Sequence, residues 1–485
     1  MSDTVRQGVA QEAGTLSTQL TADDAVHVYA EEHGAQTKIM DVYVFDAAAA
    51  GVELAYDDLL TWVSDRIERC APIFRQRLVR VPGDLDYPYW SLDATFDLRN
   101  HVTLTASAGP GWDSLMHQIG GIVDGPVDLT RPPWELHVIT DVSGIADLPA
   151  DAAVAVLKFH HCVGDATETV RLGRQLFASE SEPATADVGT ERDRSRLSML
   201  GVAVRRAPRS VARLVSGLAR LRKDGRGAAA EIPAAARQWP QTRFNRPLTS
   251  TLRFGRVVFD LPAVMAVRSQ CLGATVNDVV LSVIADAMSA YLAEVGEWPD
   301  GSLGARMPYS TRAFKESTAG NRFDVLSVNL HTDVADPLER LRAIRDSAQE
   351  AKDGLTKRLG APNAHTLDEI PAPYMRMALK ADARARRAGQ PVLGGNTLIS
   401  NVGRGIADLQ LLGSPVVDSF GILPITDGAG LSHFVASLAD RLTITFTADA
   451  VMMPELERYA RLLRAGFTEL AALSELEASQ ADTSA

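Results

Sequence analysis

An apolar strand that ends in two histidines is the most informative segment of this chain. Residues 152–159 are apolar and rich in Val, Leu and Phe, as in a buried strand, and His160 and His161 follow directly. After Asp165 the apolar residues change to helical spacing, and Asp165 with Glu168 resembles an N-terminal capping box. A strand, a turn and a helix in this order indicate an α/β protein, in which loops at strand ends often carry the chemistry.

The turn has a functional and a structural interpretation. An imidazole at a strand end titrates near neutral pH and can accept a proton from a hydroxyl or an amine. The spacing alone is explained equally well by two ordinary partly buried histidines, with Asp165 as a helix cap. We expect no metal site, because no second cluster with ligand spacing accompanies His160 and His161. Cys162 is expected to be a packing residue.

Length, cysteine content and charge limit the class of protein. A chain of 485 residues exceeds one typical core, so two domains of roughly 200 residues are expected. Its three cysteines lie far apart, which argues against a disulfide framework and for a reducing compartment. The N-terminus lacks an apolar signal core, and no uninterrupted apolar run approaches about 18 residues. The net charge of −12 disfavours nucleic acid as a partner, so we expect no nucleic-acid binding. We expect the protein to be cytoplasmic.

Changes in composition predict two α/β domains and a linker. Residues 1–185 form the first domain, within which a short helix is expected over 22–32. Residues 186–250 begin polar and acidic and are expected to be the linker. Residues 251–475 resume the alternation of strands and helices as a second domain, and 476–485 are expected to be a flexible tail.

The linker contains a basic segment. Residues 205–226 hold eight Lys or Arg side chains against one Asp, and apolar residues recur among them at helical spacing. A helix here would be cationic on one side and apolar on the other. It is either a packed crossover helix with a solvated charged face, or a surface attracted to an anionic membrane or a phosphate-bearing substrate.

Five segments, in order along the chain, resemble motifs of one enzyme family. The turn His160–Ala166 resembles the HHxxxDG motif of the CoA-dependent acyltransferase superfamily, which includes chloramphenicol acetyltransferase and peptide-synthetase condensation domains. The closer resemblance, over about residues 40 to 470, is to the bacterial wax ester synthase/diacylglycerol acyltransferase family. The further segments that carry it are Arg131–Glu135 (RPLWE), Asn277–Leu281 (ND), Met307–Arg312 with Gly320–Arg322 (PVSxR…GN), and Thr397–Val402 with Gly430–Leu431 (TxISNVPGP…GL).

This resemblance implies an α/β fold of two chloramphenicol-acetyltransferase-like domains, with an active-site tunnel at their interface. It implies an O-acyltransferase that moves a fatty acyl group from acyl-CoA, a co-substrate and not a bound cofactor, to a long-chain alcohol or diacylglycerol. Residues 205–226 would then place the enzyme peripherally on a membrane or lipid droplet. Two alternatives stay open: an acyltransferase with a polar natural-product acceptor or a carrier-bound donor, and a non-catalytic lipid-binding paralogue.

The resemblance also implies roles for the residues of the turn. His161 would act as general base on the acceptor hydroxyl, which attacks the thioester without a covalent enzyme intermediate. His160 is expected to be structural. Asp165 is expected to hold the turn through an arginine, for which we select Arg312, although a surface salt bridge explains that arginine equally well.

The oxyanion that develops during acyl transfer needs hydrogen-bond donors. Asn277 of the ND segment is the first candidate and Ser400 the second. The alternative for Asn277 and Asp278 is that they only cap a helix.

Three segments depart from the family pattern. Ala166 stands where the motif ends in glycine, so a positive φ there would strain the turn. Val402–Gly405 replaces the VPGP turn, and Ser437–Asp440 stands where the family tends to have a Ser-Tyr pair. These departures bear on the substrate class, and on the activity, more than on the fold.

Overall fold

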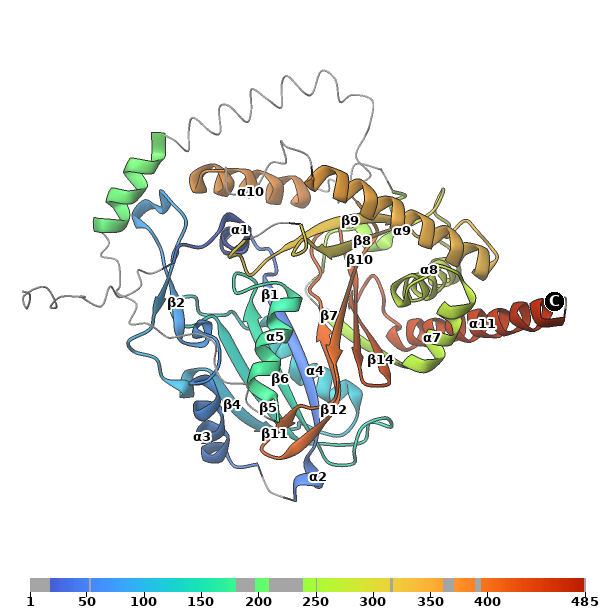
Figure 1. Cartoon of the computed structure of the whole chain (residues 1–485), viewed down its shortest axis with the longest axis horizontal. Helices are drawn as coiled ribbons and strands as arrows, with labels where there is room; N and C mark the ends of the chain where they lie inside the picture. The colour runs from blue at the N-terminus through green and yellow to red at the C-terminus, as the bar shows by residue number, and fades with distance from the viewer. Residues whose placement is uncertain are drawn as a thin grey trace, which may run out of the picture.

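Two six-stranded mixed sheets organise the molecule (Figure 1). The computed structural model describes residues 18–51, 54–179, 197–208, 239–249, 251–314, 317–360, 370–388 and 394–483. Helices cover the outer faces of both sheets, and the α/β class predicted from the sequence is confirmed. Short 3-10 turns lie at Pro72–Arg75, Pro82–Asp84, Leu98–Asn100 and Arg243–Asn245.

The first sheet has the order β11-β12-β1-β6-β5-β4. Its centre is β6, in which all nine residues are buried, as the apolar run predicted. Its strands are β1 (Lys38–Asp46), β4 (Val102–Ala106), β5 (Trp134–Val142), β6 (Ala152–His160), β11 (Gln410–Leu411) and β12 (Ser414–Ile422). A small separate sheet pairs β2 (Gln76–Val79) with β3 (Tyr89–Leu92). The helices of this half are α1 (Ala22–Glu31), α2 (Ala47–Ala50), α3 (Tyr56–Ile67), α4 (Trp112–Asp124) and α5 (Ala166–Phe177).

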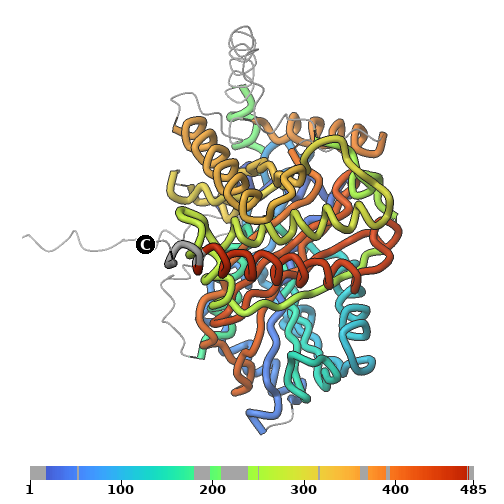
Figure 2. Tube along the Cα trace, turned by 90° about the vertical axis from the view of Figure 1, so that its right-hand side faces the viewer, coloured from blue at the N-terminus to red at the C-terminus, as the bar shows by residue number. Residues whose placement is uncertain are grey.

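The second sheet has the order β7-β14-β13-β10-β8-β9. Its strands are β7 (Leu252–Asp260), β8 (Gly304–Ser310), β9 (Phe323–Asn329), β10 (Thr397–Gly405), β13 (Leu431–Leu438) and β14 (Arg441–Asp449). Its helices are α7 (Leu261–Gln270), α8 (Val276–Glu294), α9 (Pro337–Leu359), α10 (Ala372–Arg387) and α11 (Leu456–Thr483). Figure 2 shows α11, in red, crossing one side of the molecule beside α8.

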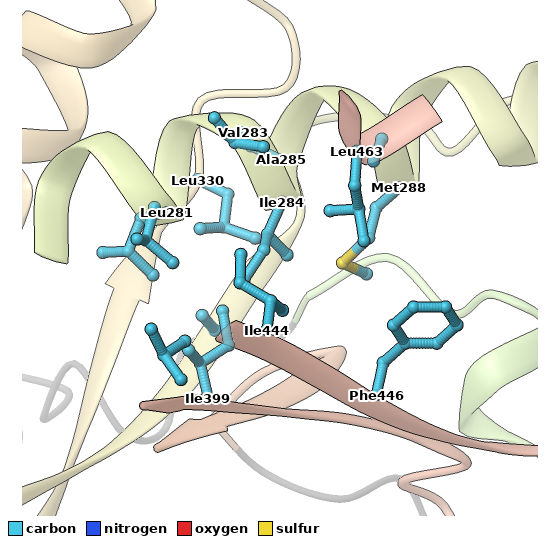
Figure 3. Close-up of a cluster of buried hydrophobic side chains, with 14 of the residues drawn as sticks. Leu281, Val283, Ile284, Ala285, Met288, Leu330, Ile399, Ile444, Phe446 and Leu463 are labelled. Carbon is cyan, nitrogen blue, oxygen red and sulfur yellow. The ribbon is translucent and has the colours of Figure 1, made fainter. Parts of the chain in front are cut away.

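Helix α8 is the centre of the second core. Leu281, Ile284 and Met288 point from it toward Ile444 and Phe446 of β14 (Figure 3). Length and composition alone would let α8 cross a membrane, but 67% of its apolar window is buried inside the fold. Burial of this kind is typical of a core helix.

The first sheet departs from the predicted division of the chain at residue 250. Strands β11 and β12 belong by sequence to 251–475, yet β12 pairs antiparallel with β1 and completes the first sheet. The reason is that β6 pairs with only one edge of β1, and the largely buried β12 supplies the backbone partners that the opposite edge needs.

A buried ion pair also joins the two halves. Arg404, in the segment that replaces the family's VPGP turn, lies 2.6 Å from Asp41 of β1, and both side chains are almost fully buried. The Arg404 guanidinium also lies over the rings of Tyr43 and Phe434. This departure from the family pattern therefore forms a polar contact between the sheets.

The tail predicted at 476–485 is helical as far as Thr483. Helix α11 continues to Thr483, because residues 474–483 are mainly good helix formers and Glu477 pairs with Arg342 at 2.6 Å.

The basic segment of the linker is described only at its start. Residues 197–208 are helical, at the periphery in both views, with Met199 and Ala203 packed against Val81 and Tyr89 (Figures 1 and 2). The predicted basic helix from residue 209 onward lies outside the described residues.

Candidate active site

The turn after β6 has the conformation that its capping residues predict. Asp165 is the N-cap of α5, and its Oδ1 accepts a hydrogen bond from the Glu168 amide at 3.0 Å. Ala166 is the first residue of this helix and does not have a positive φ. Alanine is therefore unstrained where the family motif has glycine.

Two glycines bring this turn against a loop of the second half. The Asp165 amide donates to the Gly320 carbonyl at 3.3 Å. A Cβ on Gly164 would lie 2.6 Å from the Glu168 side chain, and one on Gly320 would overlap the Val163 carbonyl. Only glycine permits this close approach of the two backbones.

Asp165 binds an arginine of the second half. Arg312 donates from Nη1 to Oδ2 at 2.7 Å and from Nη2 to Oδ1 at 2.9 Å, and the Arg322 amide donates to Oδ2 at 3.0 Å. Arg312 Nη2 also donates to the Gly320 carbonyl at 3.1 Å. The pairing expected for Asp165 is present, and it fastens the histidine turn to the loop after β8.

His160 is fully buried and has a partner for each ring nitrogen. Its Nδ1 accepts from the Cys162 amide at 3.1 Å, so the proton of the neutral ring lies on Nε2. Nε2 lies 3.0 Å from Thr37 Oγ1 and 3.4 Å from Glu31 Oε2. Both ring nitrogens of His160 are therefore in contact with protein groups.

His161 is held between two aromatic rings. His27 of α1 stacks on it with ring centroids 3.8 Å apart and an interplanar angle of 9°, and Phe323 of β9 lies 6.0 Å away on a tilted plane. The backbone is fixed by a 2.7 Å hydrogen bond from its amide to Thr37 and another of 2.7 Å from Asn321 to its carbonyl. The side chain stays partly accessible.

The surroundings keep the His161 imidazole neutral. Burial lowers its pKa to about 4, with a further lowering by His160, while its own carbonyl, Asn321 and Asp165 act in the opposite direction. Nδ1 is buried without a hydrogen-bond partner in another residue. At neutral pH the ring is therefore unprotonated and able to accept a proton.

Helix α1 contributes three side chains that the sequence interpretation missed. Asp24, His27 and Glu31 are spaced i, i+3 and i+7, which places them on one helical face. Asp24 accepts hydrogen bonds from the Asn321 amide and side chain, both at 2.9 Å. A helix was predicted over 22–32, and this spacing of two acids and a histidine on one face was the available signal.

A cleft of about 500 Å³ opens between the two halves beside this turn. The first half lines it with Trp90, Val163 and Arg171, and the second half with Gly320 and Arg322. The cleft therefore reaches the histidine turn through Val163, and its lining is both apolar and charged.

The two predicted oxyanion donors lie in different places. Asn277 is in the first turn of α8 and contacts Asn401 at 3.5 Å, while Asp278 forms a capping box with Thr275. Within the described parts of the chain, no hydrogen bond joins either side chain to His161. Ser400 is buried on β10 and alternates with the core residue Ile399, so it lies on the sheet face opposite that core.

That face of the second sheet is the one nearest His161. In β8 and β9 the core face holds Met307 and Leu326, whereas Ser310 and its partner Phe323 lie on the opposite face. Ser400 shares this face with Phe323 and Asn277 does not. The structure thus gathers His160, His161, Asp165 and Arg312 at one turn, while Ser400 lies on the same sheet face as Phe323 and Asn277 lies beside Asn401 of β10.

Comparison with known proteins identifies the family. The model of the wax ester synthase/diacylglycerol acyltransferase catalytic domain matches residues 20–280, and the model of the WS/DGAT C-terminal domain matches residues 319–471. This chain belongs to the WS/DGAT family. The protein named "Probable diacyglycerol O-acyltransferase tgs1" of Mycobacterium tuberculosis is 28% identical over 442 residues, or 88% of this chain and 91% of that protein.

Solved structures confirm the two-domain fold of this WS/DGAT protein. The wax ester synthase/diacylglycerol acyltransferase of Marinobacter aquaeolei VT8 has a TM-score of 0.63 at 22% identity, covering 94% of this chain and all of that one. The trichothecene 15-O-acetyltransferase TRI3 of Fusarium sporotrichioides has a TM-score of 0.56 at 12% identity, covering 97% and 99%. Family membership also confirms the enzyme class predicted from the sequence, an acyltransferase.

Proposed function

We propose that this WS/DGAT protein transfers a fatty acyl group from acyl-CoA to the hydroxyl of a long-chain alcohol or of diacylglycerol. The observation that carries the proposal is His161, a neutral and partly accessible imidazole that is fixed between His27 and Phe323 beside the cleft. The family match and the relative named as a diacylglycerol O-acyltransferase support this choice of substrates.

His161 would act as a general base. It accepts the hydroxyl proton while the acceptor oxygen attacks the thioester carbonyl carbon; the carbon–sulfur bond then breaks, and the CoA thiolate recovers that proton. General-base assistance contributes about 10²–10⁴ to the rate. Because the thioester is already activated, positioning of both substrates supplies the rest without a covalent enzyme intermediate.

The oxyanion of the tetrahedral intermediate would be stabilised by Ser400. Its position on the face shared with Phe323 favours it over Asn277, which contacts Asn401 beside α8. Asp165 and Arg312 would act as positioning residues, because their charged groups bind each other and hold the turn. The cleft between the halves, with Arg171 and Arg322 in its lining, would be one mouth of the predicted tunnel and admit acyl-CoA.

The test is CoA release from acyl-CoAs of rising chain length with hexadecanol, diacylglycerol or no acceptor. Wild-type protein, His161→Ala and the control His117→Ala, an exposed histidine of α4, are compared. Acceptor-dependent release that is lost only in His161→Ala supports the proposal. No release with any pair, from folded wild-type protein, would move the function to a polar acceptor, a carrier-bound donor or lipid binding alone.

The protein would meet its acceptor at an anionic membrane or lipid-droplet surface. The helix at 197–208 supports this, because Leu197 is 82% and Val204 57% exposed, and because basic residues follow it in the sequence. Pelleting with anionic liposomes tests the idea with charge-reversal variants of Arg213, Arg220 and Arg222, which lie outside the described residues. Unchanged liposome binding of these variants would contradict attachment through the basic segment.

A further inference from the structure

The ring of His27 stacks face to face on the ring of His161. The rings are nearly parallel, with an angle of 9° and centroids 3.8 Å apart, and both residues are partly buried. Helix α1 is held at this distance by Asp24, which binds Asn321, and by Glu31, which lies beside His160. The stack is thus fixed from both ends of the helix.

The geometry excludes a proton relay between the two histidines. Parallel rings present their faces to each other, whereas an imidazole donates and accepts hydrogen bonds in the ring plane. Among the contacts of the described residues, no hydrogen bond reaches the His27 ring. Any effect of His27 on His161 must therefore act through the ring face.

We propose that His27 is a positioning residue that holds the His161 imidazole by stacking and supports the positive charge His161 gains during acyl transfer. This inference rests on the proposed function, in which His161 becomes an imidazolium as it takes the hydroxyl proton. An aromatic face attracts a cation placed over it, and the attraction is stronger where water is excluded. The ring face of His27 also keeps water off one side of His161.

The face can serve this purpose only while His27 is uncharged. Burial lowers the pKa of His27 well below its usual value, and the neighbouring His161 and His160 lower it further. His27 is therefore neutral when His161 becomes charged, and the pair carries one positive charge instead of two. Because His161 gains its charge only as it takes the hydroxyl proton, the attraction acts in the transition state and not in the ground state.

Two replacements of His27 separate the aromatic face from simple burial. His27→Phe keeps a flat aromatic ring without nitrogen, and His27→Leu buries a similar volume without a face. We expect His27→Phe to keep kcat within about threefold of wild type, and His27→Leu to lower kcat about tenfold at nearly unchanged KM. His117→Ala on α4 serves as the control, and thermal melts establish that each variant is folded.

Equal kcat values for the Phe and Leu variants would overturn the proposal, as would a loss that appears only in KM. If His27→Leu does not fold, His27→Met takes its place as the aliphatic variant. If wild-type protein releases no CoA, the proposed function fails, and the ring proton signals of His161 in the resting protein test the stack. They should move in His27→Leu and stay close to wild type in His27→Phe, and identical signals in both variants would refute the stacking role.

Discussion

Replacing Asp165 with asparagine should remove the fastening between the two halves and leave the start of α5 intact. Asparagine caps a helix as well as aspartate does, so the hydrogen bond to the Glu168 amide is kept. The bidentate pairing with Arg312 is lost, because the asparagine amide nitrogen would face a guanidinium donor. The change therefore removes the ion pair, together with the hydrogen bond from the Arg322 amide to Oδ2.

The magnitude follows from burial. The Asp165 side chain is 8% exposed and that of Arg312 is 22% exposed. Removing one partner of a buried pair costs about 3–5 kcal/mol, and the partial exposure of Arg312 places the expected loss near the lower end, about 3 kcal/mol. Arg174 and Asp408 provide a more exposed control pair, in which the single nitrogen Nη2 donates to both carboxylate oxygens at 2.8 Å and both side chains are about one-third exposed. Asp408→Asn should cost less than about 1 kcal/mol.

The assay is a double-mutant cycle of urea unfolding with Asp165→Asn, Arg312→Gln and both changes together. A coupling energy of at least about 1.5 kcal/mol is expected, because the double variant leaves neither charge unpaired. Initial rates of CoA release are measured on the same proteins and should fall with stability. If Asp165→Asn kept full stability and lost activity, Asp165 would act on substrate directly, and the fastening role would be refuted.

Two further predictions concern backbone packing and pH. Gly164→Ala should cost about 1–3 kcal/mol, because its Cβ would lie 2.6 Å from the Glu168 side chain. Gly354→Ala in α9, where nothing lies within 4 Å, should stabilise by about 0.5–1 kcal/mol. Equal effects in urea unfolding would contradict the tight packing of Gly164 against Glu168. Burial lowers the pKa of His27, His161 and His433, to about 4 in His161 and to about 3 in His433. As the pH falls below about 6.5 the unfolded chain takes up these protons first, so stability should fall by up to about 1.4 kcal/mol per pH unit from each histidine. A free energy of unfolding that is flat between pH 7 and pH 5 would show that these rings are not buried as neutral groups.

Local signals explain which parts of the site could be predicted. The apolar run of β6, the cap at Asp165 and the helical spacing of α5 act over a few residues, and the structure reproduces them at 152–160 and 166–177. The family resemblance supplied the arginine for Asp165. None of this required knowledge of which distant segments meet.

The missed contributions all depend on distant segments. Asp24, His27 and Glu31 have the spacing of an ordinary polar helix face, and only the docking of α1 on the histidine turn gives them partners. Arg404 follows a glycine in a segment whose sequence predicts an exposed turn, yet it is buried and pairs with Asp41. The place of β12 beside β1 was equally hidden, because strand pairing depends on the partner and not on the strand alone.

The pairing of β12 with β1 has a consequence for the folding of this protein during its synthesis on the ribosome. Strand β1 leaves the exit tunnel early, and its partner β6 follows within the first half of synthesis. The other edge of β1 stays unpaired until residues 414–422 have been translated. An uncovered, apolar central strand is prone to pair with other chains. We therefore expect the nascent first half to stay prone to such pairing until the second half supplies β12. For the same reason, a cut in the linker would not yield two self-sufficient domains.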